Sequence, residues 1–212
     1  RGREPVIWDD VGRVRAEEID WDVRNDRSAM SGGVSTTYYG GRAGTGSTPF
    51  AKVNSPVFVS SQSAGFDHKA ESAVFTGNAR AWQDKNFVRA DRILVEQETG
   101  RFYAEGGVQS LLYDAKRTTG GKRSSVPVYA EAETMIYLSG DRILRYSKNV
   151  DIRQGTDRIR GGSAVVSLSK ENELTSTVVE GGVVITQPGR KATGDLARYD
   201  AVAETIVLRG DP

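Results

Sequence analysis

Apolar and polar residues alternate along much of this chain. In Ala73–Gln83 the odd positions include Phe75, Ala79 and Ala81, whereas most even positions are polar. In Leu144–Arg153 one parity collects the apolar residues Leu144, Tyr146, Val150 and Ile152. A period of two is typical of a strand with one buried face and one wet face. No long stretch has helical spacing, so the pattern predicts a chain that is almost entirely β.

The apolar parity changes within several of these predicted strands. In Val88–Val95 the apolar positions step from Val88 and Ala90 to Ile93 and Val95. A change of face in mid-strand is what a bulge or bend produces. Glycine pairs such as Gly32-Gly33 and Gly106-Gly107 punctuate the strands, and glycine tolerates the positive φ that a corner requires. The pattern therefore predicts a unit of strand, corner, strand and turn.

The unit recurs along the chain. A shift of 71 positions places Phe66–Val95 on Tyr137–Val166. A shift of 74 places Val14–Val34 on Val88–Val108. A shift of 133 places Phe66–Gly77 on Tyr199–Gly210. Recurrence at this spacing indicates stacked units that share a continuous core. We therefore expect one continuous domain over residues 1–212, with units at about 14–87, 88–158 and 159–212.

Two stretches interrupt the recurrence at the same place in the unit. Tyr39–Ser55 is rich in glycine, and Asp114–Ser125 carries four basic residues. Both are predicted to be surface loops on one edge of the stack. The basic loop is expected to be solvated, with contact to phosphates as the alternative.

The composition narrows the possible functions. The 212 residues include 29 basic and 28 acidic residues, and a net charge of +1 argues against a nucleic-acid surface. There is no cysteine, so disulfides and thiol chemistry are excluded, and no apolar run is long enough to span a membrane. The chain begins at Arg1 without methionine, and its last predicted strand reaches the end, so we expect a piece of a longer protein.

No catalytic constellation is evident. The single histidine, His68, has Ser139 and Ala201 as its repeat partners, so imidazole is not required at that position. The glycine-rich stretch Gly40–Gly46 is not followed by a helix, so it does not match a phosphate-binding loop. We expect neither an enzyme nor a bound cofactor or metal.

Several motifs together resemble a known family. The segments are Phe66–Ala79 (FDHKAESAVFTGNA), Val88–Ile93, Ala104–Val108, Ala192–Asp200 and Ile206–Pro212. In this order they are similar to the OstA-like family of lipopolysaccharide-transport proteins, which includes LptA and the related LptC and the N-terminal domain of LptD. The resemblance covers most of residues 56–212 and, more faintly, residues 12–34.

The resemblance implies a fold and a function. The fold would be an elongated, twisted β-jellyroll, or β-taco, open along one side. The function would be periplasmic transport of lipopolysaccharide, with the lipid A acyl chains in the apolar interior and the sugars outside. Family members stack end to end by strand pairing and bridge the inner and outer membranes. Other Lpt components, or a second copy of this chain, would be its partners, and association with either membrane is compatible with this role.

Face parity selects the residues expected to point into the interior. The predicted lipid-binding residues are Phe75, Ala79, Ala81, Val88, Ala90, Ile93, Val95, Tyr146, Val150, Ile152, Val166, Val183, Ile185 and Leu208. An ordinary packed core explains each of them equally well.

Two other functional classes remain open. A structural or adhesive β-solenoid that binds envelope polymers or proteins would have a solid core and would act through its loops. A polysaccharide-processing enzyme on a β-helix would have a cleft with clustered carboxylates whose pKa values are perturbed. Trp82, on the face opposite Ala79 and Ala81, is compatible with a partner surface or a second packed layer.

Overall fold

The protein is all-β in the computed structural model, which describes residues 4–39, 47–50, 55–112, 116–119, 122–169, 174–201, 203 and 205–210. Within residues 113–125 only the backbone of 116–119 and 122–125 is described. The strands are β1 (Val6–Trp8), β2 (Gly12–Arg15), β3 (Glu18–Asp22), β4 (Arg27–Tyr38), β5 (Val57–Asp67), β6 (Ser72–Gln83), β7 (Asn86–Glu96), β8 (Arg101–Leu112), β9 (Lys116–Thr119), β10 (Lys122–Ser125), β11 (Val128–Leu138), β12 (Ile143–Gln154), β13 (Asp157–Leu168), β14 (Leu174–Gln187), β15 (Arg190–Asp200) and β16 (Thr205–Arg209).

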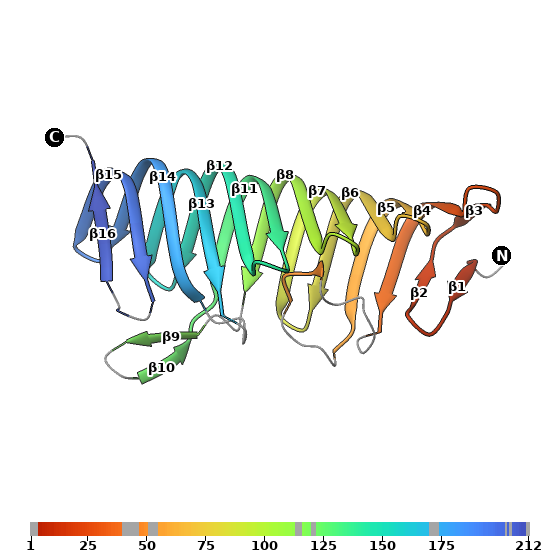
Figure 1. The fold of residues 1–212 in the computed structure, drawn as a ribbon, viewed down its shortest axis with the longest axis horizontal. Helices are drawn as coiled ribbons and strands as arrows, with labels where there is room; N and C mark the ends of the chain where they lie inside the picture. Colours follow the sequence, from red (N-terminus) through yellow and green to blue (C-terminus); the bar gives the residue numbers. More distant parts are fainter. Residues whose placement is uncertain are drawn as a thin grey trace.

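Fourteen strands form one antiparallel sheet. Its order is β1-β2-β4-β5-β6-β7-β8-β11-β12-β13-β14-β15-β16, with β3 paired to β4, while β9 and β10 pair separately. The strands follow one another along the long axis of the molecule, with the termini at opposite ends (Figure 1). This confirms the predicted elongated all-β fold of repeated strand-turn-strand units. The described residues contain no helix that is long and apolar enough to cross a membrane.

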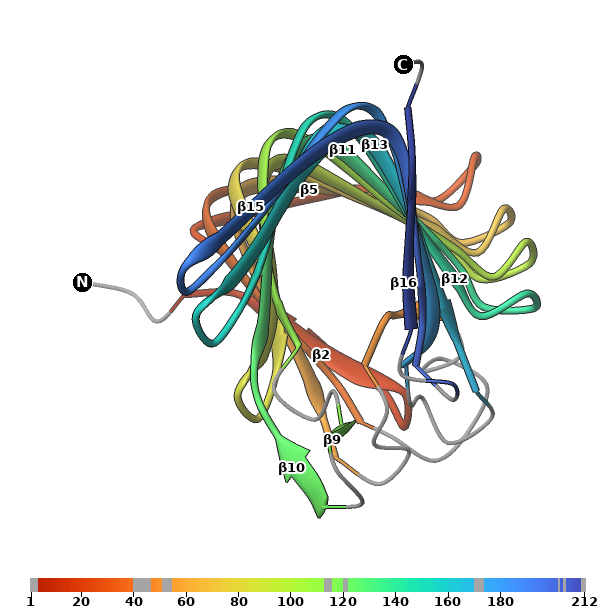
Figure 2. The same cartoon turned by 90° about the vertical axis from the view of Figure 1, so that its left-hand side faces the viewer.

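A row of bulges bends the sheet. Alternate strands each carry two consecutive residues with positive φ, namely Gly32-Gly33, Gly77-Asn78, Gly106-Gly107, Lys148-Asn149 and Gly181-Gly182. The pairing register shifts at these places, as between Thr76 and Ala79 on β6. A bulge bends its strand, and aligned bulges bend the sheet as a whole. Two parts of the sheet therefore face each other across the long axis (Figure 2). We call the part that contains Phe75 wall 1 and the part that contains Ala81 wall 2.

The sequence repeat is also a repeat of strand pairing. On wall 1 Phe75 lies opposite Ile93, and 71 residues later Tyr146 lies opposite Ala164. The recurrence therefore reflects equivalent places in the sheet. From here on, the first unit means strands β5–β8 and the second unit means strands β11–β14, which the shift of 71 relates, rather than the predicted unit bounds. The unit boundaries and the origin of the chain in a longer protein stay predictions.

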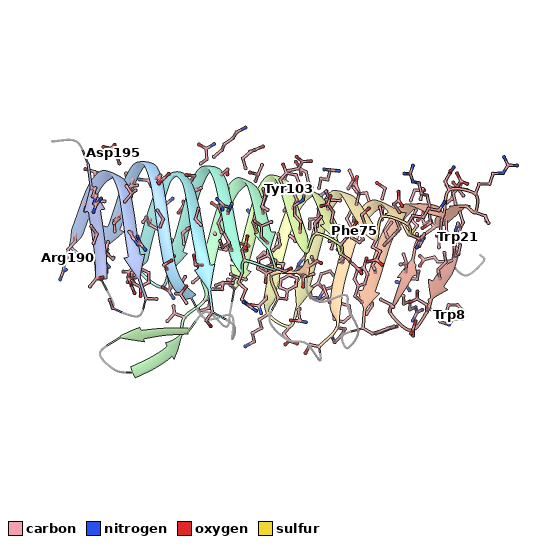
Figure 3. All side chains as sticks on the ribbon, viewed as in Figure 1. Trp8, Trp21, Phe75, Tyr103, Arg190 and Asp195 are labelled. Carbon is pink, nitrogen blue, oxygen red and sulfur yellow. The ribbon has the colours of Figure 1, made fainter. Side chains whose placement is uncertain are left out.

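The middle of the sheet encloses a packed core. The side chains of Phe75, Val88, Ile93 and Phe102 have no solvent exposure. Complete burial of such a side chain contributes about 1.5–3 kcal/mol, so this cluster holds wall 1 and wall 2 together. By contrast, Trp8 and Trp21 lie at the N-terminal end of the sheet, where they are 72% and 53% exposed (Figure 3).

Two glutamines fasten the long connections to the sheet. The Gln83 side-chain amide donates a hydrogen bond to the carbonyl of Ser55 at 2.8 Å, and the Gln154 amide donates to the carbonyl of Val126 at 3.3 Å. Donors and acceptors are each 71 residues apart, and each acceptor precedes a proline. We call this repeated contact the glutamine clasp. Because the clasp precedes β5 and β11, both long connections leave the same edge of the sheet, as predicted.

The two connections are more structured than the expected loops. Ser47, Thr48 and Phe50 are buried, and Phe50 belongs to the hydrophobic core. An aromatic ring gains free energy by leaving water, which explains why this part of the connection returns to the body of the protein. In the second connection, β9 and β10 form a hairpin. The remaining predicted loop residues, 40–46, 51–54, 114–115 and 120–121, lie outside the described part of the chain.

An ion-pair cluster lies on the outer side of wall 2. The Asp151 carboxylate accepts hydrogen bonds from Arg158 and, at 2.9 Å, from Arg153, which also reaches Glu131 at 3.3 Å. The Asp151 carboxylate is mostly buried, and the hydrogen bond from Arg158 is the main reason why its pKa is lowered from 3.8 to about 2.

Replacing Lys148 by glycine is expected to stabilise the fold. Lys148 has φ 65°, whereas its repeat equivalent in the first unit is Gly77. A side chain in the left-handed region costs about 1–2 kcal/mol, part of which is offset because glycine also loosens the unfolded chain. We expect K148G to raise the free energy of unfolding by about 1 kcal/mol in urea titrations. K148A keeps the strain and is the control, and an equal gain in K148A would contradict this explanation.

Replacing Asp151 by asparagine is expected to destabilise the fold in a pH-dependent way. The pKa shift corresponds to about 2 kcal/mol of stabilisation of the charged carboxylate. Because the folded-state pKa is lowered, this contribution is present above pH 4 and is lost as the pH falls towards 2. Thermal unfolding of D151N and wild type should therefore differ most near neutral pH and converge in acid. A constant difference across this range would show that the charge of Asp151 is not the cause.

Candidate functional site

The second unit places smaller side chains at positions where the first unit is filled. On wall 1 Ile93 of the first unit corresponds to Ala164. In the next row Phe102 lies opposite Val95, whereas the residue opposite the equivalent Val166 is Thr177. Both replacements remove volume from the space between the walls. The same fold therefore encloses a packed core in the middle and leaves space nearer the C-terminus.

This space is an apolar cavity of about 140 Å³ between wall 1 and wall 2. We call it the C-terminal groove. Its apolar lining consists of Leu112, Val128, Ala130, Leu144, Tyr146, Ile152, Ile159, Val166, Leu168, Leu174, Ile185, Ala197, Tyr199 and Ile206. Ile206 is 49% exposed, so the groove reaches solvent at the last strand of the sheet. The first unit differs at this place, because its Val88 is fully buried whereas the repeat equivalent in the second unit, Ile159, is half-buried.

The polar groups of the groove are few and mostly paired. The hydroxyls of Tyr146 and Ser110 are 2.9 Å apart and buried. Burial raises the pKa of Tyr146 to about 12, so the phenol stays neutral. Asp157, Arg158 and Gln187 also line the groove, from the ends of β13 and β14 nearest the edge of wall 2. The interior is thus neutral and apolar, and the charged groups lie at one edge.

A second cavity, of about 250 Å³, lies at the N-terminal end. Met30, Thr36, Phe66 and Val95 belong to its lining. The Thr36 hydroxyl is buried and has no hydrogen-bond partner in the described structure. The packed core around Phe75 lies between this cavity and the C-terminal groove along the sheet order.

His68 takes part in an aromatic cluster beside the N-terminal cavity. Its ring stacks on Trp21 at 5.7 Å, and its Nε2 lies 3.2 Å from the Ser28 hydroxyl. Within the described residues, no group of three or more histidine, aspartate or glutamate side chains could hold a metal ion.

The predicted lipid-binding residues fall into distinct places. Four line the C-terminal groove, namely Tyr146, Ile152, Val166 and Ile185. Six lie in the packed region with at most 3% exposure, namely Phe75, Ala79, Ala81, Val88, Ala90 and Ile93. The others are Val95 in the N-terminal cavity, Val150 and Val183 buried beside the bulges, and Leu208 packed against the core. Lipid contact stays a prediction at all fourteen positions.

The face parity of the predicted strands did not identify several residues that line the groove. Leu112, Ile159, Leu168, Leu174 and Tyr199 line it but were not among the candidates. Ile159 has a clear signal, because the shift of 71 carries Val88 onto it. Leu168 and Leu174 flank a connection, where strand periodicity ends and gives no signal.

No curated protein sequence matches the chain. Among solved structures, it is similar to the crystal structure of LptH, the LptA-homologous periplasmic component of the lipopolysaccharide transport device of Pseudomonas aeruginosa. The identity is 14% and the TM-score 0.46, over 74% of this chain and 96% of LptH.

A protein family also matches the chain. The model of the family described as LptA/(LptD N-terminal domain) LPS transport protein matches residues 58–145 and again residues 131–212. Together these matches span most of the chain and both units of the sheet. A family of transport proteins also agrees with the expectation that the chain is not an enzyme. The chain belongs to the LptA/LptD N-terminal domain family of lipopolysaccharide transport proteins.

Proposed function

We propose that this protein carries lipopolysaccharide in the periplasm and shields the lipid A acyl chains in the C-terminal groove. The observation that carries the proposal is an apolar space between the two walls of a protein from a lipopolysaccharide transport family. The periplasmic location is supported by the family and by the description of LptH as a periplasmic component.

The groove suits acyl chains on physical grounds. Removing a methylene from water contributes about 0.8 kcal/mol, so ten buried methylenes contribute roughly 8 kcal/mol before the cost of ordering the chain. The neutral Tyr146–Ser110 pair adds no charge to the interior. The charged side chains Asp157 and Arg158 lie at the edge, where a saccharide headgroup would emerge.

The ends of the sheet support a role as a bridge. At the C-terminal end β16 pairs only with β15, and Ile206 and Val207 are about half exposed. At the N-terminal end β1 and β3 each pair on one side within the described sheet. Unpaired backbone groups can add a strand from another protein. End-to-end pairing with other Lpt components, or with a second copy, would extend the apolar interior from the inner towards the outer membrane.

Photocrosslinking tests the location of the lipid. A photoreactive amino acid at Ile159, inside the groove, should crosslink to lipopolysaccharide added to the purified chain. The same amino acid at Ser147, which is exposed on the outer side of wall 1, is the control. Equal labelling from both sites, or labelling from Ser147 alone, would contradict an interior lipid path.

Filling the groove should reduce lipid binding without unfolding the protein. T177F restores the aromatic residue that the first unit has at this place, Phe102. We expect binding of lipopolysaccharide to weaken at least tenfold, because the added ring occupies the space of an acyl chain. S176F adds the same ring on the opposite face of β14 and serves as the matched control. Unchanged binding in T177F, with a circular dichroism spectrum like that of wild type, would argue that the groove is not the lipid site.

A further inference from the structure

Two arginines face each other on the outer side of wall 2 in the first unit. Arg80 on β6 is directly opposite Arg89 on β7, and both are exposed. Like charges in directly opposite positions destabilise a sheet. Their next neighbours in the same row are Ser60 and Gln109, which carry no charge. Among the described residues, neither arginine has a carboxylate partner.

Aromatic rings hold one of the two guanidinium groups in place. Phe58 and Trp82 stack at 5.5 Å between ring centroids, and Trp82 lies opposite Phe87. The Arg80 guanidinium lies 5.3 Å from the ring centroids of both Trp82 and Phe87. These contacts restrict the side chain and leave its N–H groups free for a ligand, which lowers the entropy lost on binding. We call Phe58, Arg80, Trp82, Phe87 and Arg89 the arginine–aromatic patch.

The second unit shows that the fold does not require this arrangement. The shift of 71 carries Arg80 onto Asp151 and Arg89 onto Arg160. There Asp151 forms ion pairs with Arg153 and Arg158, the equivalents of Trp82 and Phe87. The same place in the sheet therefore holds a neutralised cluster in one unit and an unpaired arginine pair in the other. Within the described part of the chain, no carboxylate offsets the charge of Arg80 and Arg89, and their exposed positions would suit an external anion.

The chemistry of the patch selects the kind of anion. Adjacent guanidinium groups bind phosphate through several charge-assisted hydrogen bonds. Aromatic rings beside them pack against the apolar C–H face of a sugar ring. Arg80 and Arg89 are each three residues from the strand ends at Gln83 and Asn86, so the two guanidinium-bearing positions are roughly 10 Å from the edge of the wall. Asp157 and Arg158, where a saccharide would leave the C-terminal groove, lie at the repeat-equivalent edge of wall 2, so a saccharide that runs along this edge can reach the patch.

We propose that the arginine–aromatic patch binds phosphorylated sugars of lipopolysaccharide on the outside of the sheet. This inference rests on the proposed function, since it takes the transported lipid as the source of the saccharide. It goes beyond that function because it gives the saccharide a specific binding place on the outer face of β6 and β7.

The test uses a saccharide that has no acyl chains. Isothermal titration calorimetry of the full chain with fully deacylated, phosphorylated lipopolysaccharide should detect binding. The double variant R80Q/R89Q should weaken it at least tenfold, and W82A should weaken it without a change of charge. R160Q is the matched control, because it removes one exposed arginine at the repeat equivalent of Arg89, and it should bind as wild type does. The same saccharide after phosphatase treatment should bind at least tenfold more weakly than before.

Four results would overturn the proposal. They are no binding of the deacylated saccharide to wild type, equal loss in R160Q, undiminished binding after phosphatase treatment, and tighter binding of hexaglutamate than of the saccharide. The last result would indicate an acidic protein segment as the occupant instead. Failure of the proposed function is distinguishable, since it would abolish crosslinking from Ile159 and leave binding of the deacylated saccharide intact.

Discussion

The aligned bulges are the constraint on which the rest of the structure depends. A single antiparallel sheet of this length would expose both faces to water, because only the short stretch at 47–50 is buried against it from outside the sheet in the described chain. Two residues in the left-handed region on every second long strand bend the sheet so that it covers itself. The parity change in the sequence follows from the same bend, since apolar residues must keep facing the interior on both sides of the extra residue. The fold requires the positive φ angles of the bulge more strictly than it requires glycine, because Lys148 and Asn149 keep these angles without being glycine.

Once the bend is set, side-chain size decides what the interior contains. Val95 and Val166 occupy equivalent places in the two units, yet Phe102 is fully buried opposite Val95, whereas the smaller Thr177 lines the groove opposite Val166. A backbone that hardly changes between units can thus offer either a hydrophobic core or an apolar groove. The distribution of large and small residues along the axis places the packed core in the middle and the cavities towards the two ends.

Much of this could be predicted from the sequence. The alternation of apolar and polar residues predicted the strands, the change of apolar parity predicted the bend, and the sequence repeat predicted the continuous sheet. Which parts of the interior are a packed core and which are a groove could not be predicted in the same way. Ala79, Ala81 and Ala90 have small side chains, yet they lie in the packed region and do not line the groove. Which residues meet across the interior depends on the angle of the bend, and neither periodicity nor residue size reports that angle. The burial of Phe50 was missed for the same reason, since a connection carries no period that would show where it returns.

The glutamine clasp has a consequence for how this architecture varies. Each clasp fixes the residue two positions before a new strand to the sheet edge, whatever the length of the chain before it. The register of β5 and β11 is therefore independent of the size of the preceding connection. Segments can lengthen, shorten or acquire a hairpin of their own there without displacing a single apolar residue from the interior. New contacts can therefore be added at that edge, on the outside of the protein, while the interior keeps its structure.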